Sequence, residues 1–344
     1  MFRWSTSHNI PFDFHGHPDN ALGSSITSTI INNTIWLVVE YYDNYDDKVK
    51  HQIAVFDPTT FETIKLDCEI PGQDGIRNIA SQGDQLYIVT DDGMYNNNIY
   101  QFDTKTTKLT NFLNVHARFR GSLRVVGDKM YTLAENDDRI QVVLITINLS
   151  DKAVERKVLV EKNERCHYEL LHINEEFYMF TRTNHEREVF LIDKNVELQK
   201  LVLMQPNHPP LTHDWVEDCN ITQPSLFTFG NYNLEYIDFN TNQWKTTAIE
   251  EIKNSNFDRF LKSGEKIDDK IYVVFQLVAR SMETVHYEIK VLDLEPKLVD
   301  ICLLQLIEEL VSEKDENKLE NILEDLAIPL RQKFINMIEW RKGG

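Results

Sequence analysis

Residues 53–60 read IAVFDPTT and residues 99–106 read IYQFDTKT; in both, a short apolar run ends at an aspartate that a turn follows. The pattern returns as LITINLSD (144–151), VFLIDKNV (189–196), LEYIDFNT (234–241) and IKVLDLEP (289–296). The polar residues that end the runs are Asp57, Asp103, Asn148, Asp193, Asp238 and Asp293, at steps of 46, 45, 45, 45 and 55 residues. Such regular spacing indicates a repeat architecture in which each repeat is one supersecondary unit.

A second series of apolar runs precedes the first and predicts a hairpin in each repeat. The runs place an aromatic residue at Trp36, Tyr87, Tyr131, Tyr178 and Tyr272, and the weaker run SLFTF places Phe227 in the remaining repeat. The strong members follow tight polar turns at Asn32-Asn33, Gly83-Asp84, Gly127-Asp128, Asn174-Glu175 and Asp268-Asp269. Gly, Asn and Asp tolerate the positive φ that two-residue hairpin turns require.

Each repeat is therefore expected to form four short antiparallel strands, because the runs are rich in Val, Ile, Tyr and Phe and are bounded by turn residues. Six such repeats predict a mainly β protein with a β-propeller of six blades, although repeat counting leaves seven open. The last repeat lacks an outer strand. We expect Phe2 to Ser5 to supply it, with Trp4 in the place that Trp244 takes in the fifth repeat.

The repeat length and the pattern of two apolar residues, Asp, and a Thr three positions later resemble kelch repeats, over about residues 20 to 295. The Gly-Gly doublet usual in kelch blades is missing. A WD40 propeller is disfavoured because no Gly-His or Trp-Asp signature recurs. The resemblance implies a kelch-like propeller domain over residues 1–295.

From Glu295 the apolar period changes from 2 to 3.6, which predicts helices. Pro296 suits a first helical turn, and Leu298, Cys302, Leu306 and Leu310 lie four apart on one face. Two further amphipathic segments follow, from Leu319 and from Pro329. The expected result is a small α-helical bundle over residues 296–344 whose first helix has more apolar surface than one contact needs.

The spacing Leu298-x-x-x-Cys302-x-x-x-Leu306 resembles the BC box that opens VHL-type and SOCS-type boxes. The resemblance implies contacts with elongin C, and through it elongin B, from Leu298, Ile301, Cys302 and Leu306. The segment IPLRQKF resembles the cullin-contacting part, which implies cullin contacts from Ile328, Pro329, Leu330 and Phe334. Arg331 stands in place of a second proline, which favours a VHL-type cullin partner. Lys297 and Leu306 depart from the usual box, and the alternative is that these helices cap the propeller around an inert core cysteine.

Charge and composition narrow the choice of partners. The formal net charge is -19, which repels phosphate backbones and makes nucleic acid a poor partner. No apolar run reaches the roughly 18 residues of a membrane span, so no membrane partner is expected. Because the four cysteines are scattered without CxxC spacing, neither a disulfide framework nor a zinc site is indicated. We expect a reduced, intracellular protein that is cytoplasmic, nuclear or both.

No catalytic signature is present: the sequence lacks HExxH, GxSxG and a phosphate-binding loop. His208 and His213, with nearby acids, suit a polar loop better than a metal site, so we expect no metal, no cofactor and no enzyme activity. Four arginines lie near predicted starts of inner strands and are candidates for binding an acidic or C-terminal peptide by forked hydrogen bonds: Arg77, Arg118, Arg120 and Arg259. Surface ion pairs are the alternative role for each of them.

Taken together, the resemblances imply a substrate-recognition subunit of a cullin-RING ubiquitin ligase. The propeller would bind the target and the C-terminal helices would bind elongin C. Two alternatives stay open. One is a propeller scaffold without a ligase role, and the other is a propeller enzyme with an unrecognised site.

Overall fold

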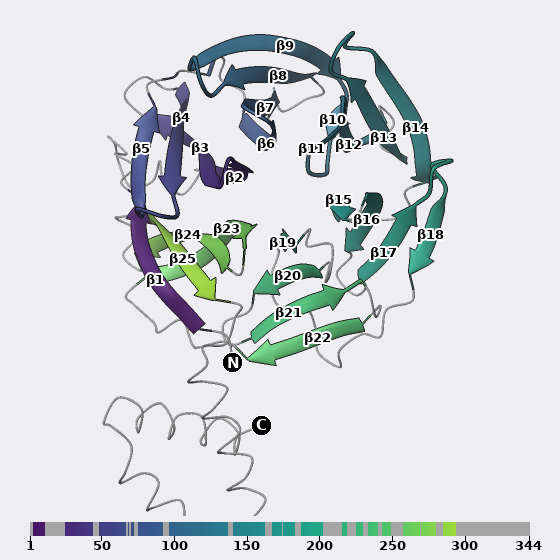
Figure 1. Cartoon of the computed structure of the whole chain (residues 1–344). Coiled ribbons are helices and arrows are strands. Elements are labelled where there is room, and N and C mark those ends of the chain that lie inside the picture. Colours follow the sequence, from purple (N-terminus) through teal and green to yellow (C-terminus); the bar gives the residue numbers. More distant parts are fainter. Residues whose placement is uncertain are drawn as a thin grey trace, which may run out of the picture.

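The computed structural model describes residues 3–10, 25–43, 48–66, 68, 70–71, 75–91, 96–136, 140–161, 167–173, 175–182, 187–201, 215–218, 225–229, 233–239, 243–248, 257–268, 270–279 and 285–293. These residues form antiparallel sheets arranged as the blades of a β-propeller (Figure 1). The mainly β class and the propeller are thus confirmed. The helical bundle expected over residues 296–344 lies outside the described residues and stays a prediction.

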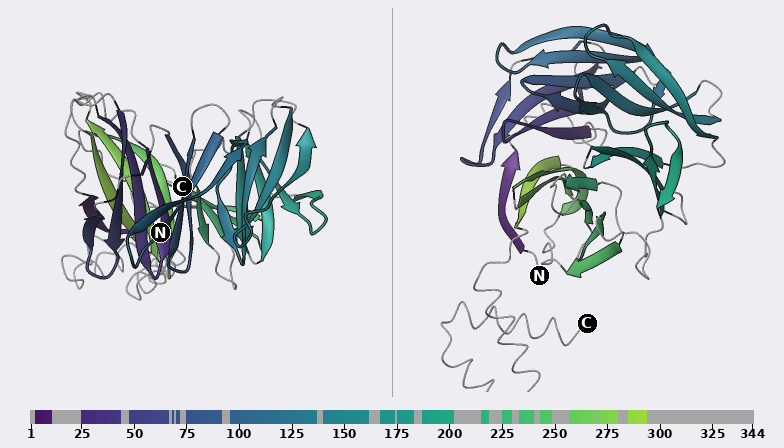
Figure 2. Two further views of the ribbon diagram at one scale, coloured as in Figure 1. Left: turned by 90° about the horizontal axis from the view of Figure 1, so that it is seen from above. Right: turned by 45° about the vertical axis from the view of Figure 1, so that its right-hand side comes forward.

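Six sheets surround the axis, and we number them as blades in chain order (Figures 1 and 2). Blade one contains β2 (Ser25–Ile31), β3 (Thr34–Asp43), β4 (Lys48–Asp57) and β5 (Glu62–Leu66). Blade two contains β6 (Gly75–Gln82), β7 (Gln85–Asp91), β8 (Asn96–Asp103) and β9 (Lys108–His116). Blade three contains β10 (Arg118–Phe119), β11 (Arg124–Val126), β12 (Lys129–Glu135), β13 (Gln141–Asn148) and β14 (Val154–Glu161).

The remaining blades complete the ring. Blade four contains β15 (His167–Ile173), β16 (Glu176–Arg182), β17 (Arg187–Ile192) and β18 (Leu198–Leu201). Blade five contains β19 (Trp215–Asp218), β20 (Ser225–Phe229), β21 (Asn233–Asp238) and β22 (Gln243–Ala248). Blade six contains β23 (Phe257–Ile267), β24 (Lys270–Ala279) and β25 (Val285–Asp293), with β1 (Arg3–Ile10) on its outer edge.

The chain closes the ring through its N-terminal strand, as the sequence predicts. β1 pairs antiparallel with β25, from Arg3 opposite Asp293 to Ile10 opposite Tyr287. Trp4 lies opposite Leu292, and Trp244 of β22 lies opposite Ile237. Leu292 and Ile237 each precede the repeating aspartate, so the two tryptophans occupy equivalent backbone positions. Phe2 lies outside the described residues.

The repeats found in the sequence share one strand register. In each blade the repeating aromatic of the second strand pairs with the residue two positions before the polar residue that ends the third strand. These pairs are Trp36–Val55, Tyr87–Gln101, Tyr131–Thr146, Tyr178–Leu191, Phe227–Tyr236 and Tyr272–Val291. The repeating aromatic residue therefore has an equivalent backbone partner in each blade.

The second strands are continuously apolar because both of their faces are buried. In β3, Ile35 and Leu37 pack against blade six, whereas Trp36 and Val38 pack against blade two. Alternate side chains of a strand point to opposite faces, so a blade inside the ring buries both sets. The cores of the propeller accordingly lie between blades.

The repeating aromatic residue points from its own blade toward the next. Trp36 lies 6.0 Å from Phe102 of blade two, measured between ring centroids. The rings of Tyr131 and Phe177 lie 4.4 Å apart between blades three and four. Equivalent contacts join Tyr178 to Phe239 at 4.9 Å and Tyr272 to Phe56 at 6.1 Å, and the last of these crosses the ring closure. Aromatic pairs at such separations contribute about 0.5–1.5 kcal/mol each beyond their burial.

One end of the propeller, which we call the hairpin end, carries the turns between first and second strands. Six of the described residues in these turns have positive φ: Asn32, Asn33, Gly83, Gly127, Glu175 and Asp268. The turns that follow the third strands lie at this end too. There the repeating polar side chain accepts backbone N–H groups, as in Thr59 N to Asp57 Oδ1 (2.7 Å) and Ser150 N to Asn148 Oδ1 (2.9 Å). The innermost strands begin at the opposite end, which we call the strand-start end.

Candidate functional site

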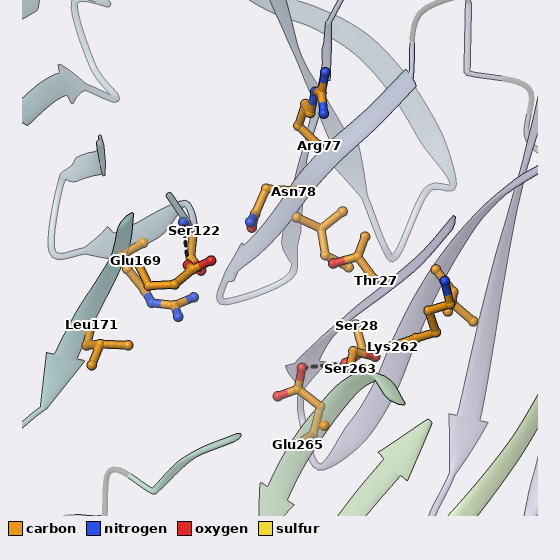
Figure 3. A pocket seen from close by; sticks show the side chains of 14 residues that line it. Thr27, Ser28, Arg77, Asn78, Ser122, Glu169, Leu171, Lys262, Ser263 and Glu265 are labelled. Atoms are coloured by element: carbon orange, nitrogen blue, oxygen red, sulfur yellow. Dashed lines mark hydrogen bonds between the residues drawn. The ribbon is translucent and has the colours of Figure 1, made fainter. Parts of the chain in front are cut away.

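A cavity of about 320 Å³ lies at the axis of the propeller, between the innermost strands (Figure 3). Its lining comes from β2, β6, β15 and β23 and from β11 with the residues before it. These residues are Ile26, Thr27, Ser28, Arg77, Asn78, Ile79, Ser122, Arg124, Glu169, Leu171, Lys262, Ser263, Gly264 and Glu265. Most of the side chains are polar or charged, in contrast to the apolar cores between blades.

Two carboxylates lie on the cavity walls, and a serine of a neighbouring blade holds each of them (Figure 3). Ser28 Oγ donates to Glu265 Oε1 over 2.7 Å, which joins blade one to blade six. Ser122 donates to Glu169 Oε2 through its backbone N at 3.2 Å and through Oγ at 2.6 Å. Each interaction both fixes a carboxylate and links two blades.

Glycine makes the contact between Ser122 and Glu169 possible. A Cβ at Gly121 would lie 3.2 Å from the Leu133 Cβ and 3.3 Å from the backbone N of Leu170. Both distances are tighter than most Cβ contacts, so a larger residue here would require the neighbouring strands to shift by a few tenths of an ångström. That approach brings Ser122, the next residue, within hydrogen-bonding distance of Glu169.

The basic side chains of the cavity interact with the protein itself. Arg77 lines the cavity and its Nε pairs with Asp91 Oδ2. Arg124 Nη1 donates to the carbonyl oxygen of Leu123 at 3.3 Å, and Lys262 also takes part in interactions within the chain. In β15, burial lowers the pKa of His172, and the nearby Arg124 acts in the same direction. Glu175 partly opposes this lowering of the pKa, and His172 itself is not among the residues that line the cavity.

The arginines expected to bind a target occupy different places. Arg77 lies in the cavity wall, whereas Arg118 and Arg120 are not among the lining residues. Arg120 Nη2 and Arg118 Nη1 instead reach Glu135 Oε2, at 3.1 and 3.5 Å, and the Glu135 side chain is only 1% exposed. Arg259 belongs to β23, but its side chain lies outside the described part of the structure. The first three arginines thus form ion pairs, Arg77 with Asp91 and the other two with the buried Glu135.

Several expected features fall outside the described residues. They include the elongin-binding and cullin-binding residues of the C-terminal segment and the histidines at positions 208 and 213. Within the described part of the chain, no cluster of three or more His, Cys, Asp or Glu side chains is suited to holding a metal ion. The same residues include no helix long and apolar enough to cross a membrane.

Sequence reasoning missed most of the cavity lining, including Asn78, Ser122, Arg124, Glu169 and Glu265. A usable signal was present. Thr27, Asn78, Ser122, Glu169 and Ser263 each lie two residues before the first-strand position that pairs with the repeating aromatic. Extending the repeat alignment into the first strands would have placed these five polar residues at one level of the axis.

No protein-family model matches the sequence, and no curated protein is similar to it in sequence. Solved structures share its fold at low identity. The α-L-arabinofuranosidase Arb93A of Fusarium graminearum is 10% identical, with a TM-score of 0.57 over 85% of this chain and 98% of that one. The β-propeller domain of the Trilobed protease of Pyrococcus furiosus is 12% identical, with a TM-score of 0.43 over 76% and 82%. An acylaminoacyl peptidase of Pyrococcus horikoshii is 12% identical, with a TM-score of 0.44, and the chain covers only 45% of its length.

Proposed function

We propose that the protein is a recognition subunit that holds a target in its central cavity and joins a cullin–elongin ubiquitin ligase through its C-terminal segment. The observation that carries the recognition role is the cavity, a polar space of about 320 Å³ at the axis. A concave site with convergent polar groups is the usual form of a ligand-binding site.

The hydrogen bonds of the two carboxylates favour binding over catalysis. Acid–base catalysis by a carboxyl pair needs one group that keeps its proton near neutral pH and one that does not. Glu169 and Glu265 each already accept a hydrogen bond from a serine hydroxyl of a neighbouring blade, so both carboxylates are held in place by the scaffold. Two carboxylates facing one cavity still make an enzyme the second candidate. Turnover of a substrate that is abolished by both Glu169→Gln and Glu265→Gln would establish it.

The ligase part of the proposal rests on the sequence of residues 298–334 and on where the propeller ends. The Leu298-x-x-x-Cys302 spacing resembles a BC box, and Ile328-Pro329 resembles the start of a cullin-contacting helix. β25 ends at Asp293, at the hairpin end, so the C-terminal segment starts there. Arg77 and Lys262 lie toward the strand-start end, so a target and an elongin partner can approach different ends of the propeller.

The proposed mechanism is proximity. The protein performs no chemistry itself, but it raises the concentration of target lysines near the charged ubiquitin carrier.

Co-expression of the full chain with elongins B and C tests the ligase role. The wild type is expected to co-purify with both elongins, and the variant carrying Leu298→Ser and Cys302→Phe is expected to lose them. Glu308→Ala is the matched control, because the sequence places Glu308 on the polar strip of the same expected helix. A wild type that captures no elongin would leave a propeller scaffold without a ligase role.

A further inference from the structure

Polar side chains line the central cavity at one height along the propeller axis, which we call the polar level. The packing between blades does not require polar side chains there. Thr27, Asn78, Ser122, Glu169 and Ser263 lie at equivalent positions of five innermost strands and all face the cavity. The corresponding position of blade five lies outside the described residues. On the second strands, the backbone partners of this level include Val38, Val89 and Val274, which are all fully or almost fully buried. In these strand pairs, the second-strand residue is apolar and buried, whereas its first-strand partner is polar and faces the cavity.

Glu169 is the acidic residue at this level, and the described residues donate hydrogen bonds to only one of its two carboxylate oxygens. Both hydrogen bonds from Ser122 go to Oε2. Among the described residues, no donor reaches Oε1. In Figure 3 the Glu169 carboxylate lies on one wall, with a guanidinium group of the lining beside it, and Glu265 lies on another wall. A carboxylate fixed on one side and free on the other is preorganised to accept a hydrogen bond from a ligand.

The positive charges of the cavity also have interaction partners within the protein. Arg77 is paired with Asp91, while Arg124 and Lys262 interact within the chain. Outside the cavity, Glu135 engages Arg118 and Arg120. The whole chain carries a formal charge of -19, which attracts cations over long distances and repels anions. These observations weigh against the acidic peptide expected from the arginines.

We propose that the central cavity binds a basic side chain of a protein target, the ammonium group of lysine or the guanidinium group of arginine. Glu169 Oε1 is its anionic acceptor. Asn78 offers a neutral acceptor at the same level. The inference rests on the proposed recognition role and specifies the kind of target that the cavity accepts.

Fluorescence polarisation with the full chain tests this selectivity. Four labelled hexapeptides of one sequence would differ at a single position, which carries Lys, Arg, Gln or Glu. The Lys and Arg peptides are expected to bind about tenfold more tightly than the Gln peptide, since a charge-assisted hydrogen bond is replaced by a neutral one. The Glu peptide is expected to bind most weakly. Preference for the Glu peptide would restore the acidic target and overturn the proposal, as would equal binding or no binding of all four peptides.

Matched variants assign the effect to the cavity. Glu169→Gln is expected to weaken the Lys peptide about tenfold, because the amide oxygen still accepts from Ser122 but the charge is gone. Glu155→Gln makes the same chemical change on the exposed outer strand β14 and should leave binding unchanged. Asn78→Asp adds an acid to the polar level and should strengthen the Lys peptide. Equal affinities for the Glu169 and Glu155 variants, or weaker binding by Asn78→Asp, would contradict the assignment.

The elongin experiment separates this inference from the ligase role. Glu169→Gln should still co-purify with the elongins as the wild type does. If the wild type selects basic peptides but captures no elongin, the cavity assignment stands and the ligase role fails. If it captures elongins but shows no preference for basic peptides, the ligase role stands and the cavity assignment fails.

Discussion

The hairpin end of the propeller and the walls of its central cavity follow different rules, although the same strands build both. At the hairpin end, the described blades share one register, positive-φ turns and a polar residue that accepts backbone N–H groups. Around the cavity, equivalent positions carry Thr, Asn, Ser, Glu and Ser. At the hairpin end, backbone geometry restricts which residue types can occupy each position. Around the axis, the contacts between blades are hydrogen bonds of individual side chains, such as Ser28 to Glu265 and Ser122 to Glu169, so equivalent positions carry different residues.

The largest expected effect tests whether Arg118 and Arg120 stabilise the fold. Glu135 is buried and receives Arg118 and Arg120. Glu135→Gln should lower the free energy of unfolding by about 2 kcal/mol, because two charge-assisted interactions are lost while the arginines gain some water. Chemical denaturation measures the change.

Exposed Glu155 provides the matched control, since Glu155→Gln should change stability by less than about 0.5 kcal/mol. If the two variants were equally stable, the arginines would be free for a ligand. Arg118 and Arg120 would then belong with the cavity residues that can bind a ligand and not with the residues that stabilise the fold.

The next effect tests the turn geometry of the hairpin end. Gly127 has a φ of +59°, and an added Cβ would meet nothing within 4 Å. Gly127→Val should therefore destabilise by about 1–2 kcal/mol through backbone strain alone. Gly127→Asn should cost much less, since Asn32 adopts a φ of 50° in the equivalent turn of blade one. Thermal unfolding of both variants checks the difference, and equal losses would show that steric contact rather than φ decides.

The same contrast explains how much the sequence could predict. Strand order, the hairpin turns and closure by the N-terminal strand were predictable, because each depends on a pattern that backbone geometry imposes on many residues at once. Trp4 and Trp244 illustrate this, since their equivalence follows from counting alone. The repeat alignment also places Glu169 at the axis, but the hydrogen bonds of its side chain do not follow from that alignment. Its role depends on a contact with Ser122, 47 residues away, and on the close approach that Gly121 allows.

The smallest effect concerns the acid that ends the third strands. Hydrogen bonds from the Thr106 backbone, and then from Gln85, lower the pKa of Asp103 below its ordinary value of 3.8. A group whose pKa is lower in the folded state adds stability above the unfolded pKa and loses it as the pH falls through the folded pKa. Wild type should therefore lose more thermal stability than Asp103→Asn between about pH 5 and about pH 2.5. At neutral pH the variant should differ little, since Asn148 already makes the equivalent turn with an amide. The reciprocal change, Asn148→Asp, should make blade three more sensitive to acid, and a variant that unfolds with the wild-type pH profile would show that the charge is irrelevant to the turn.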